Sequence, residues 1–162
     1  MNGIYIALGA NLPSVHGAPR ETLEAALAAL AKRGVAILQR SSWWRSAPQP
    51  ASAQPDFING AAEIATALAP RDLLSLLHQV EADFGRVRGE RWAARVLDID
   101  LLDYRGIRTD EEGICLPHPR LQDRLFVLLP LQEIAPAWRH PVSGETLDDL
   151  LYRANPLKIN KL

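Results

Sequence analysis

The sequence has almost no cysteine and no long run of apolar residues. Its 162 residues include a single cysteine, Cys115, so an internal disulfide is excluded and a reducing compartment is favoured. No stretch approaches the ~20 apolar residues that a membrane-spanning helix needs. The first residues lack the basic and apolar segments of a signal peptide. We therefore expect a cytoplasmic protein that does not bind a membrane.

The sequence also lacks a strong excess of charge and several familiar ligand-binding signatures. The formal net charge is −1, which gives no general attraction to nucleic acid. There is no phosphate loop ending in Lys-Ser or Lys-Thr, and no kinase glycine-rich loop with its later motifs. A His and Cys cluster for zinc and a twelve-residue EF-hand loop are missing too. The common nucleotide-binding folds, zinc and calcium are thus disfavoured.

The order of predicted elements indicates an α+β protein. Prolines and glycines delimit two helical patterns, from Pro19 to Gly34 and from Pro70 to Gly85. Strand-like segments precede, separate and follow them, at residues 4–8, 35–45, 57–66 and around 97–104. This order is typical of a ferredoxin-like sandwich, an antiparallel sheet with helices packed on one face. We expect one domain over residues 1–162, with the other sheet face free for a ligand.

Two carboxylates interrupt the last of these strands, Asp98 and Asp100. Strand side chains alternate, so both acids share one face, whereas Leu97, Ile99 and Leu101 share the other. Mg²⁺ is commonly bound by one or two carboxylates together with substrate phosphates. The spacing is therefore typical of a magnesium site, while an acid pair that faces solvent without metal remains an alternative.

An arginine cluster lies just before the acid pair. Arg86, Arg88, Arg91 and Arg95 fall within ten residues and are opposed there only by Glu90. The guanidinium fork matches phosphate oxygens, so the cluster and the acids together predict a site for magnesium and polyphosphate. Simple surface pairing of Arg with Asp is the competing interpretation, although such pairs contribute only ~0 to 1 kcal/mol to stability.

Several separated motifs resemble one enzyme family. The run RWAARVLDIDLL at residues 91–102 resembles the diagnostic motif of hydroxymethyldihydropterin pyrophosphokinase. YIALGANLP, QPDFINGA, FGRVR and LPHPRLQDRLFVLLPLQEIAP follow the same family in the same order. The resemblance implies the ferredoxin-like fold and transfer of pyrophosphate from ATP to 6-hydroxymethyl-dihydropterin in folate biosynthesis, with release of AMP.

The resemblance also implies roles for individual residues. Asp98 and Asp100 would bind two Mg²⁺ ions, and Arg86 and Arg95 would act with them in catalysis. The loop at residues 46–56 would close over the substrates. The ATP site would comprise Arg86, Arg88, Trp92, Arg95, His118 and Arg124, and the pterin site would comprise Phe57, Asn59, Trp92 and Phe126. No general base is indicated.

The chain departs from the family at a few positions. A basic residue of the Arg-rich loop is replaced by Gly89, and that loop is one residue shorter. Phe57 stands where Tyr is common, and Pro119 follows the His where an aromatic residue can stand. The shortened loop puts its phosphate contacts in question, but none of these changes touches the paired acids.

Two other functions remain as alternatives. Metal-dependent nucleotidyltransferases also use Asp-x-Asp, but they typically carry Gly-Ser shortly before the first Asp, where this chain has Val96 and Leu97. A ferredoxin-like RNA-binding module would need exposed aromatic and basic residues on its central strands. We therefore expect a monomeric enzyme whose partners are small molecules rather than nucleic acid.

Overall fold

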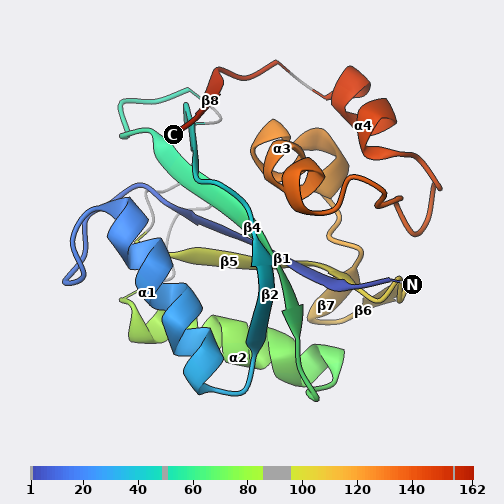
Figure 1. Cartoon of the computed structure of the whole chain (residues 1–162), viewed down its shortest axis with the longest axis horizontal. Coiled ribbons are helices and arrows are strands. Elements are labelled where there is room, and N and C mark those ends of the chain that lie inside the picture. Colours follow the sequence, from blue (N-terminus) through green and yellow to red (C-terminus); the bar gives the residue numbers. More distant parts are fainter. Residues whose placement is uncertain (1, 49–50, 86–95, 155) are drawn as a thin grey trace.

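The computed structural model describes residues 2–48, 51–85, 96–154 and 156–162 and consists of an antiparallel sheet with helices on both faces (Figure 1). The strand order is β5-β1-β4-β3-β8, and β2 also pairs with β4. A separate hairpin of β6 and β7 follows β5. The strands are β1 (Ile4–Ala10), β2 (Ala36–Arg40), β3 (Trp44–Ser46), β4 (Phe57–Ala65), β5 (Asp98–Tyr104), β6 (Thr109–Glu111), β7 (Ile114–Leu116) and β8 (Ile159–Lys161).

One face of the sheet, called here the lower face, is covered by α1 (Pro19–Lys32) and α2 (Pro70–Asp83) (Figure 1). Both helices begin at a proline, where the missing N–H costs nothing. Each is followed by a glycine with positive φ, Gly34 at 84° and Gly85 at 91°. Their apolar stripes are buried against the strands, and each fully buried Leu or Val contributes roughly 1.5 to 3 kcal/mol. Both predicted helices are confirmed.

The opposite, upper face is partly covered by α3 (Leu125–Ile134) and α4 (Leu147–Arg153). A second cluster of buried residues joins Tyr5, Ala7 and Leu102 of the sheet to Leu128 and Leu131 of α3. The α+β class and the antiparallel sheet are confirmed. This face is predicted to be free for a ligand, but the apolar side chains of α3 are buried against part of it, so only the remainder is open.

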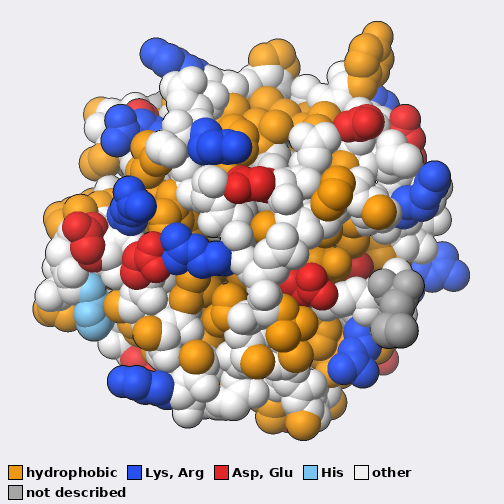
Figure 2. All heavy atoms as spheres, viewed as in Figure 1, with side chains coloured by type: hydrophobic (Ala, Val, Ile, Leu, Met, Phe, Trp, Pro, Cys, Tyr) orange, Lys and Arg blue, Asp and Glu red, His pale blue; other side chains and the backbone are white. Residues whose placement is uncertain are grey.

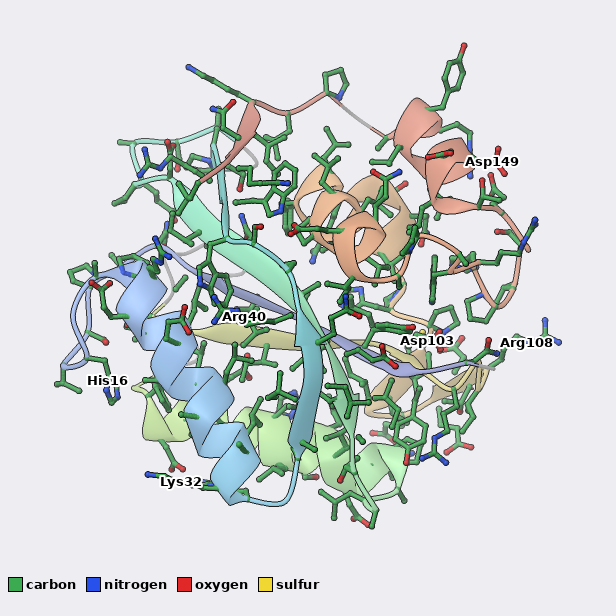
Figure 3. The ribbon with its side chains drawn as sticks, viewed as in Figure 1. His16, Lys32, Arg40, Asp103, Arg108 and Asp149 are labelled. Carbon is green, nitrogen blue, oxygen red and sulfur yellow. The ribbon has the colours of Figure 1, made fainter. Side chains whose placement is uncertain are left out.

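Within β5, the alternation of side chains between the two faces of the sheet is interrupted once. Tyr5 of β1 pairs with Asp103, but the next residue, Ile6, pairs with Leu101. Leu102 is therefore the extra residue of a β-bulge and joins the upper cluster, while Leu101 belongs to the lower one. Asp103, labelled in Figure 3, is buried and accepts a hydrogen bond of 2.8 Å from Trp138 Nε1. The alternation predicted from residue 97 to 102 is confirmed.

The segment 35–45, predicted as one strand, forms two. It breaks at Ser41, whose backbone N–H donates to Ala61 O and whose side-chain Oγ accepts from Ala61 N, each at 2.9 Å. The side chain of Trp43 then enters the lower core and packs against Gly60, where any Cβ would collide with the indole ring. Gly60 thus makes room for a tryptophan within a continuous β4. The prediction of one strand across Asn59 and Gly60 is confirmed.

Charges on the surface are mixed. On the face seen in Figure 2, Lys and Arg side chains are interspersed with Asp and Glu, and apolar atoms lie between them.

Among the helices that the structure describes, none has the length and apolarity to cross a bilayer. The expected location in the cytoplasm stays a prediction.

Candidate active site

The candidate site lies on the upper face of the sheet and is centred on β1. Gly9 of β1 pairs on one side with Asn59 of β4 and on the other with Asp98 of β5. Two residues away along β1, on the same face, Ala7 pairs with Asp100. Because β1 contributes only a hydrogen atom and a methyl group at these positions, the space above it is bordered by the acids of β5 and the amide of β4.

Asp100 is the centre of a cluster of charged and titratable groups. His118 Nε2 lies 3.8 Å from one of its carboxylate oxygens, and Arg124 Nη1 lies 3.7 Å from the other. His118 follows the β6–β7 hairpin, and its backbone N–H donates to Leu102 O at 2.8 Å, which ties this loop to β5. Arg124 immediately precedes α3, with its guanidinium 5.5 Å from the ring centre of Phe126. Residues far apart in sequence therefore meet around one carboxylate.

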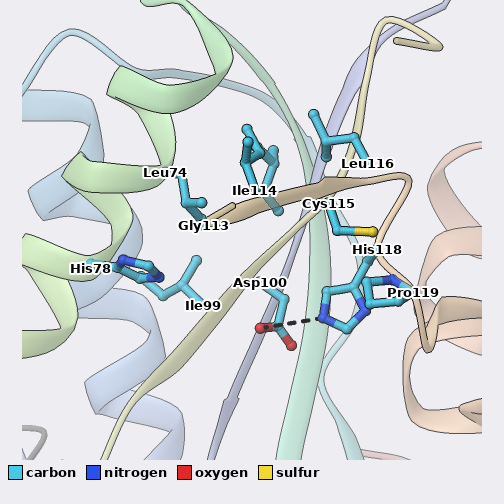
Figure 4. A pocket seen from close by; sticks show the side chains of 11 residues that line it. Leu74, His78, Ile99, Asp100, Gly113, Ile114, Cys115, Leu116, His118 and Pro119 are labelled. Atoms are coloured by element: carbon cyan, nitrogen blue, oxygen red, sulfur yellow. Dashed lines mark ion pairs between the residues drawn. The ribbon is translucent and has the colours of Figure 1, made fainter. Parts of the chain in front are cut away.

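His118 is held in its neutral form. Its pKa is lowered from 6.5 to about 4, chiefly because burial penalises the charged ring, and Arg124 acts in the same direction against a weaker opposing effect of Asp98. The ring Nδ1 accepts a hydrogen bond of 3.2 Å from Arg120 N. The single proton therefore sits on Nε2, which faces Asp100 (Figure 4). Near pH 7, His118 offers one neutral hydrogen-bond donor to the site.

A cavity of about 230 Å³ opens beside this cluster, between α2, the outer edge of β5 and β7 (Figure 4). Asp100 and His118 lie at one side of it, and His78 of α2 lies at the other. Most of the remaining wall is apolar. The lining residues are Leu74, His78, Ile99, Asp100, Leu101, Gly113, Ile114, Cys115, Leu116, His118 and Pro119. Such a cavity suits a group with both apolar and polar atoms that is attached to a charged one.

The amide of Asn59 is buried and has a defined orientation. Its Nδ2 donates to Ser46 Oγ on β3 at 2.7 Å, and the side chain is only 4% exposed. Its Oδ1 points toward β1, since a Cβ built on Gly9 would lie 3.1 Å from it. Phe57 is half-buried two residues earlier on the same strand. Ser46 was missed in the sequence, where a serine before a Pro-rich loop gives no signal of its own.

The loop at residues 46–56 is attached to the end of β1. Asn11, only 2% exposed, donates from Nδ2 to Gln54 Oε1 and to Pro55 O, each at 3.1 Å. The far end of the loop therefore lies beside the strand that carries Gly9. No local pattern connects Asn11 with Gln54, because the contact spans 43 positions.

The structure thus brings some predicted site residues together and leaves others outside its description. Asp100, His118 and Arg124 converge, with Phe126 beside Arg124, and Asp98 and Asn59 flank Gly9. Four predicted residues, Arg86, Arg88, Trp92 and Arg95, and the shortened loop at Gly89, lie outside the described residues.

The carboxylate oxygens of Asp98 and Asp100 suit one kind of metal site. Within the described ranges, no three His, Cys, Asp or Glu side chains gather closely enough to hold an ion by themselves. Asp98 and Asp100 offer hard oxygen ligands on one face, with Arg124 beside them. This set fits Mg²⁺ that is shared with ligand phosphates, a common mode for that ion. The fold and the site together define a phosphate-handling enzyme of the α+β class.

Comparison with known proteins identifies the family. Residues 5–136 match the family model described as 7,8-dihydro-6-hydroxymethylpterin-pyrophosphokinase. Three bacterial relatives are each named 2-amino-4-hydroxy-6-hydroxymethyldihydropteridine pyrophosphokinase. The protein of Synechocystis is 40% identical over 93% of this chain and 75% of its own length. Those of Methylorubrum extorquens and Pseudomonas aeruginosa are 37% and 41% identical, over 100% and 91% of this chain and 99% and 89% of their own lengths. The chain belongs to the hydroxymethyldihydropterin pyrophosphokinase family.

Proposed function

We propose that this chain binds ATP and 6-hydroxymethyl-dihydropterin on the upper face of its sheet and transfers the β,γ-pyrophosphoryl group between them. Family membership makes it an ATP-dependent pyrophosphokinase of folate biosynthesis. The hydroxymethyl oxygen forms a bond to the β-phosphorus, and the bond from that phosphorus to the α,β-bridging oxygen breaks. AMP leaves with the bridging oxygen, and the hydroxyl proton passes to solvent. The observation that carries the proposal is the Asn59–Gly9–Asp98 row beside the Asp100 cluster.

The nucleotide is assigned to the β5 side of the site. The cavity of about 230 Å³ would receive the base between apolar walls, which directs the phosphates toward Asp100 and His118. Arg124 and the neutral Nε2–H of His118 would donate to phosphate oxygens. Arg86, Arg88, Trp92 and Arg95 complete the proposed ATP site, with Arg86 and Arg95 stabilising charge on the leaving group.

Asp98 and Asp100 are assigned to two Mg²⁺ ions. When bound, the ions would neutralise phosphate charge and hold the triphosphate in line for attack. The protein's own part is to fix both carboxylates on one face of β5 and to keep Arg124 and His118 beside Asp100. Positioning and charge stabilisation account for most catalysis in phosphoryl transfer. This agrees with a site for which no general base is proposed.

The pterin is assigned to the β4 side of the row. Asn59 would read polar atoms at the edge of the ring, because Ser46 fixes the orientation of its amide. Phe57, Phe126 and Trp92 would contact the flat faces of the ring, a geometry that aromatic groups favour. Since Gly9 has no side chain, the hydroxymethyl group could extend over β1 toward the phosphates. Closure of the loop at residues 46–56, anchored through Asn11, would exclude water.

One chain supplies all of these residues, so we propose that the protein acts as a monomer and that residues 1–162 form one domain. The pairing of β8 with β3 supports the second point, because the last strand then belongs to the same sheet as β1. Sedimentation at the enzyme's working concentration tests the first. A stable dimer whose dissociation abolishes activity would contradict it.

Product analysis tests the proposed reaction. Protein, ATP, Mg²⁺ and 6-hydroxymethyl-dihydropterin are incubated together, and nucleotides and pterins are separated and quantified. We expect one AMP for each pterin consumed, and none when the pterin is omitted. Formation of ADP, or release of free pyrophosphate with a nucleotidyl-pterin, would exclude pyrophosphoryl transfer and favour the nucleotidyltransferase alternative. Salt-dependent binding of RNA without magnesium would favour the RNA-binding alternative.

A further inference from the structure

A buried glutamate lies behind the two acids of β5. Glu81, near the end of α2, is only 2% exposed. Its Oε2 accepts a hydrogen bond of 2.7 Å from the backbone N–H of Ile99, and the bond itself is buried. Ile99 is the single residue between Asp98 and Asp100. A carboxylate from the lower face is therefore bonded to the backbone N–H of the residue that lies between the two acids of the upper face.

The position of β5 in the sheet explains why this contact matters. In the strand order, β5 lies at one end of the sheet and pairs with β1 alone among the described strands. An end strand has outward-facing N–H groups without a strand partner, and it is held less firmly than a central one. The bond from Ile99 to Glu81 replaces a missing ladder bond at the point where both acids must be held.

Stability alone is a poor reason for this arrangement. Burying a carboxylate costs free energy even when it is hydrogen-bonded. Residues that orient the ligands of a metal commonly change metal affinity by about 10- to 100-fold when replaced. The bond from Ile99 to Glu81 attaches the backbone of β5 to α2 and can orient the two acids in this way.

We propose that Glu81 is a positioning residue. It holds the backbone at Ile99, between Asp98 and Asp100, so that both carboxylates face one polyphosphate-bound metal pair. The proposal rests on the proposed function, which assigns metal to these acids. Glu81 is not proposed to contact substrate or metal, because it reaches β5 from the side of α2.

Two substitutions separate geometry from charge. Glu81→Gln keeps an acceptor at the same reach and removes the charge, whereas Glu81→Asp keeps the charge and withdraws the acceptor by roughly 1.5 Å, one C–C bond. Mn²⁺ serves as the probe because it accepts the same octahedral oxygen ligands as Mg²⁺. Its binding is measured by electron paramagnetic resonance with an ATP analogue that carries a methylene group between the α and β phosphorus atoms. That analogue cannot be cleaved at the reacting bond.

Glu133→Asp provides a matched control. Glu133 of α3 also accepts a backbone N–H, that of Ser42 at 2.9 Å, but it does so beside β3, away from the acids. Shortening this side chain should lower thermal stability and leave Mn²⁺ affinity unchanged. A change in Mn²⁺ affinity specific to Glu81 then cannot arise from lost stability alone.

We expect Glu81→Asp to weaken Mn²⁺ binding about tenfold and Glu81→Gln to stay within about threefold of wild type. Without metal, hydrogen exchange at the Ile99 amide should accelerate in Glu81→Asp and stay slow in Glu81→Gln. Wild-type affinity in Glu81→Asp, or an equal loss in both variants, would overturn the positioning role. Equal Mn²⁺ affinity in wild type and Asp98→Asn would instead remove the proposed metal site, and this inference with it.

Discussion

Asn59 and Asp98 face each other across Gly9, one residue from each of three adjacent strands in a single row. The amide of Asn59 can form hydrogen bonds with a heterocycle, and the carboxylate of Asp98 can bind a metal. These two groups lie one strand apart, and Gly9 places no side chain between them. The two substrates of a pyrophosphokinase must meet at such a boundary, since the acceptor hydroxyl has to reach the β-phosphorus. The central strand keeps that boundary clear.

Gly9→Ala should impair activity more than stability. The added methyl group would lie 3.1 Å from Asn59 Oδ1, so the amide must shift by a few tenths of an ångström. Small displacements of positioning groups are costly in rate, and we expect kcat/KM for the pterin to fall about tenfold. Steady-state kinetics and thermal melting measure the two effects. Wild-type kinetics in a folded variant would show that the space above Gly9 is not used.

Ser46→Ala should affect the pterin and spare the nucleotide. The substitution removes the acceptor of the 2.7 Å hydrogen bond from Asn59 Nδ2, and an unsatisfied buried donor costs about 1 to 3 kcal/mol. The amide can then rotate, so KM for the pterin should rise while the affinity for ATP stays the same. Calorimetric titration with each substrate separates the two. Ser46→Thr keeps the hydroxyl and serves as the control.

Asp98→Asn should abolish turnover without destabilising the fold. The lost charge would lower kcat at least about a hundredfold, the scale on which a single transition-state charge contact matters. Thermal stability should be unchanged or higher, because the repulsion between two like charges on one face of β5 is removed. Asp100→Asn should lose activity equally. A large drop in melting temperature with turnover intact would support a purely structural acid pair.

His118 should stay neutral through the physiological range and make stability sensitive to acid. Its folded-state pKa of about 4 lies below the unfolded value of 6.5. Protons therefore bind the unfolded chain first, and stability falls as pH drops from about 6.5 to about 4, by up to about 3 kcal/mol. Urea denaturation at pH 7 and pH 5 should show this loss in the wild type and a smaller loss in His118→Gln. A His118 pKa near 6.5 in an NMR titration would contradict this.

Local patterns in the sequence were sufficient for much of this architecture. The 3.6-residue period and the flanking proline and glycine predicted α2, and strand alternation predicted that Asp98 and Asp100 share a face. Both features depend on neighbours in the chain, so a single sequence carries them.

Contacts between distant residues could not be read in the same way. The break at Ser41 depends on Trp43 packing against Gly60, and the orientation of Asn59 depends on Ser46, thirteen positions away. Glu81 looks like an ordinary polar residue of a helix until Ile99 is brought beside it. Family resemblance supplied the pterin and the pyrophosphoryl group, which no pattern of charge or periodicity specifies.

The position of bond cleavage tests the central claim most directly. ATP labelled with ¹⁸O in the α,β-bridging position is converted with 6-hydroxymethyl-dihydropterin and Mg²⁺, and the products are analysed by mass spectrometry. Attack at the β-phosphorus leaves the bridging oxygen on the departing nucleotide, so all of the label should appear in AMP and none in the pterin diphosphate. Label in pyrophosphate, or any labelled ADP, would place the attack at another phosphorus atom and contradict pyrophosphoryl transfer.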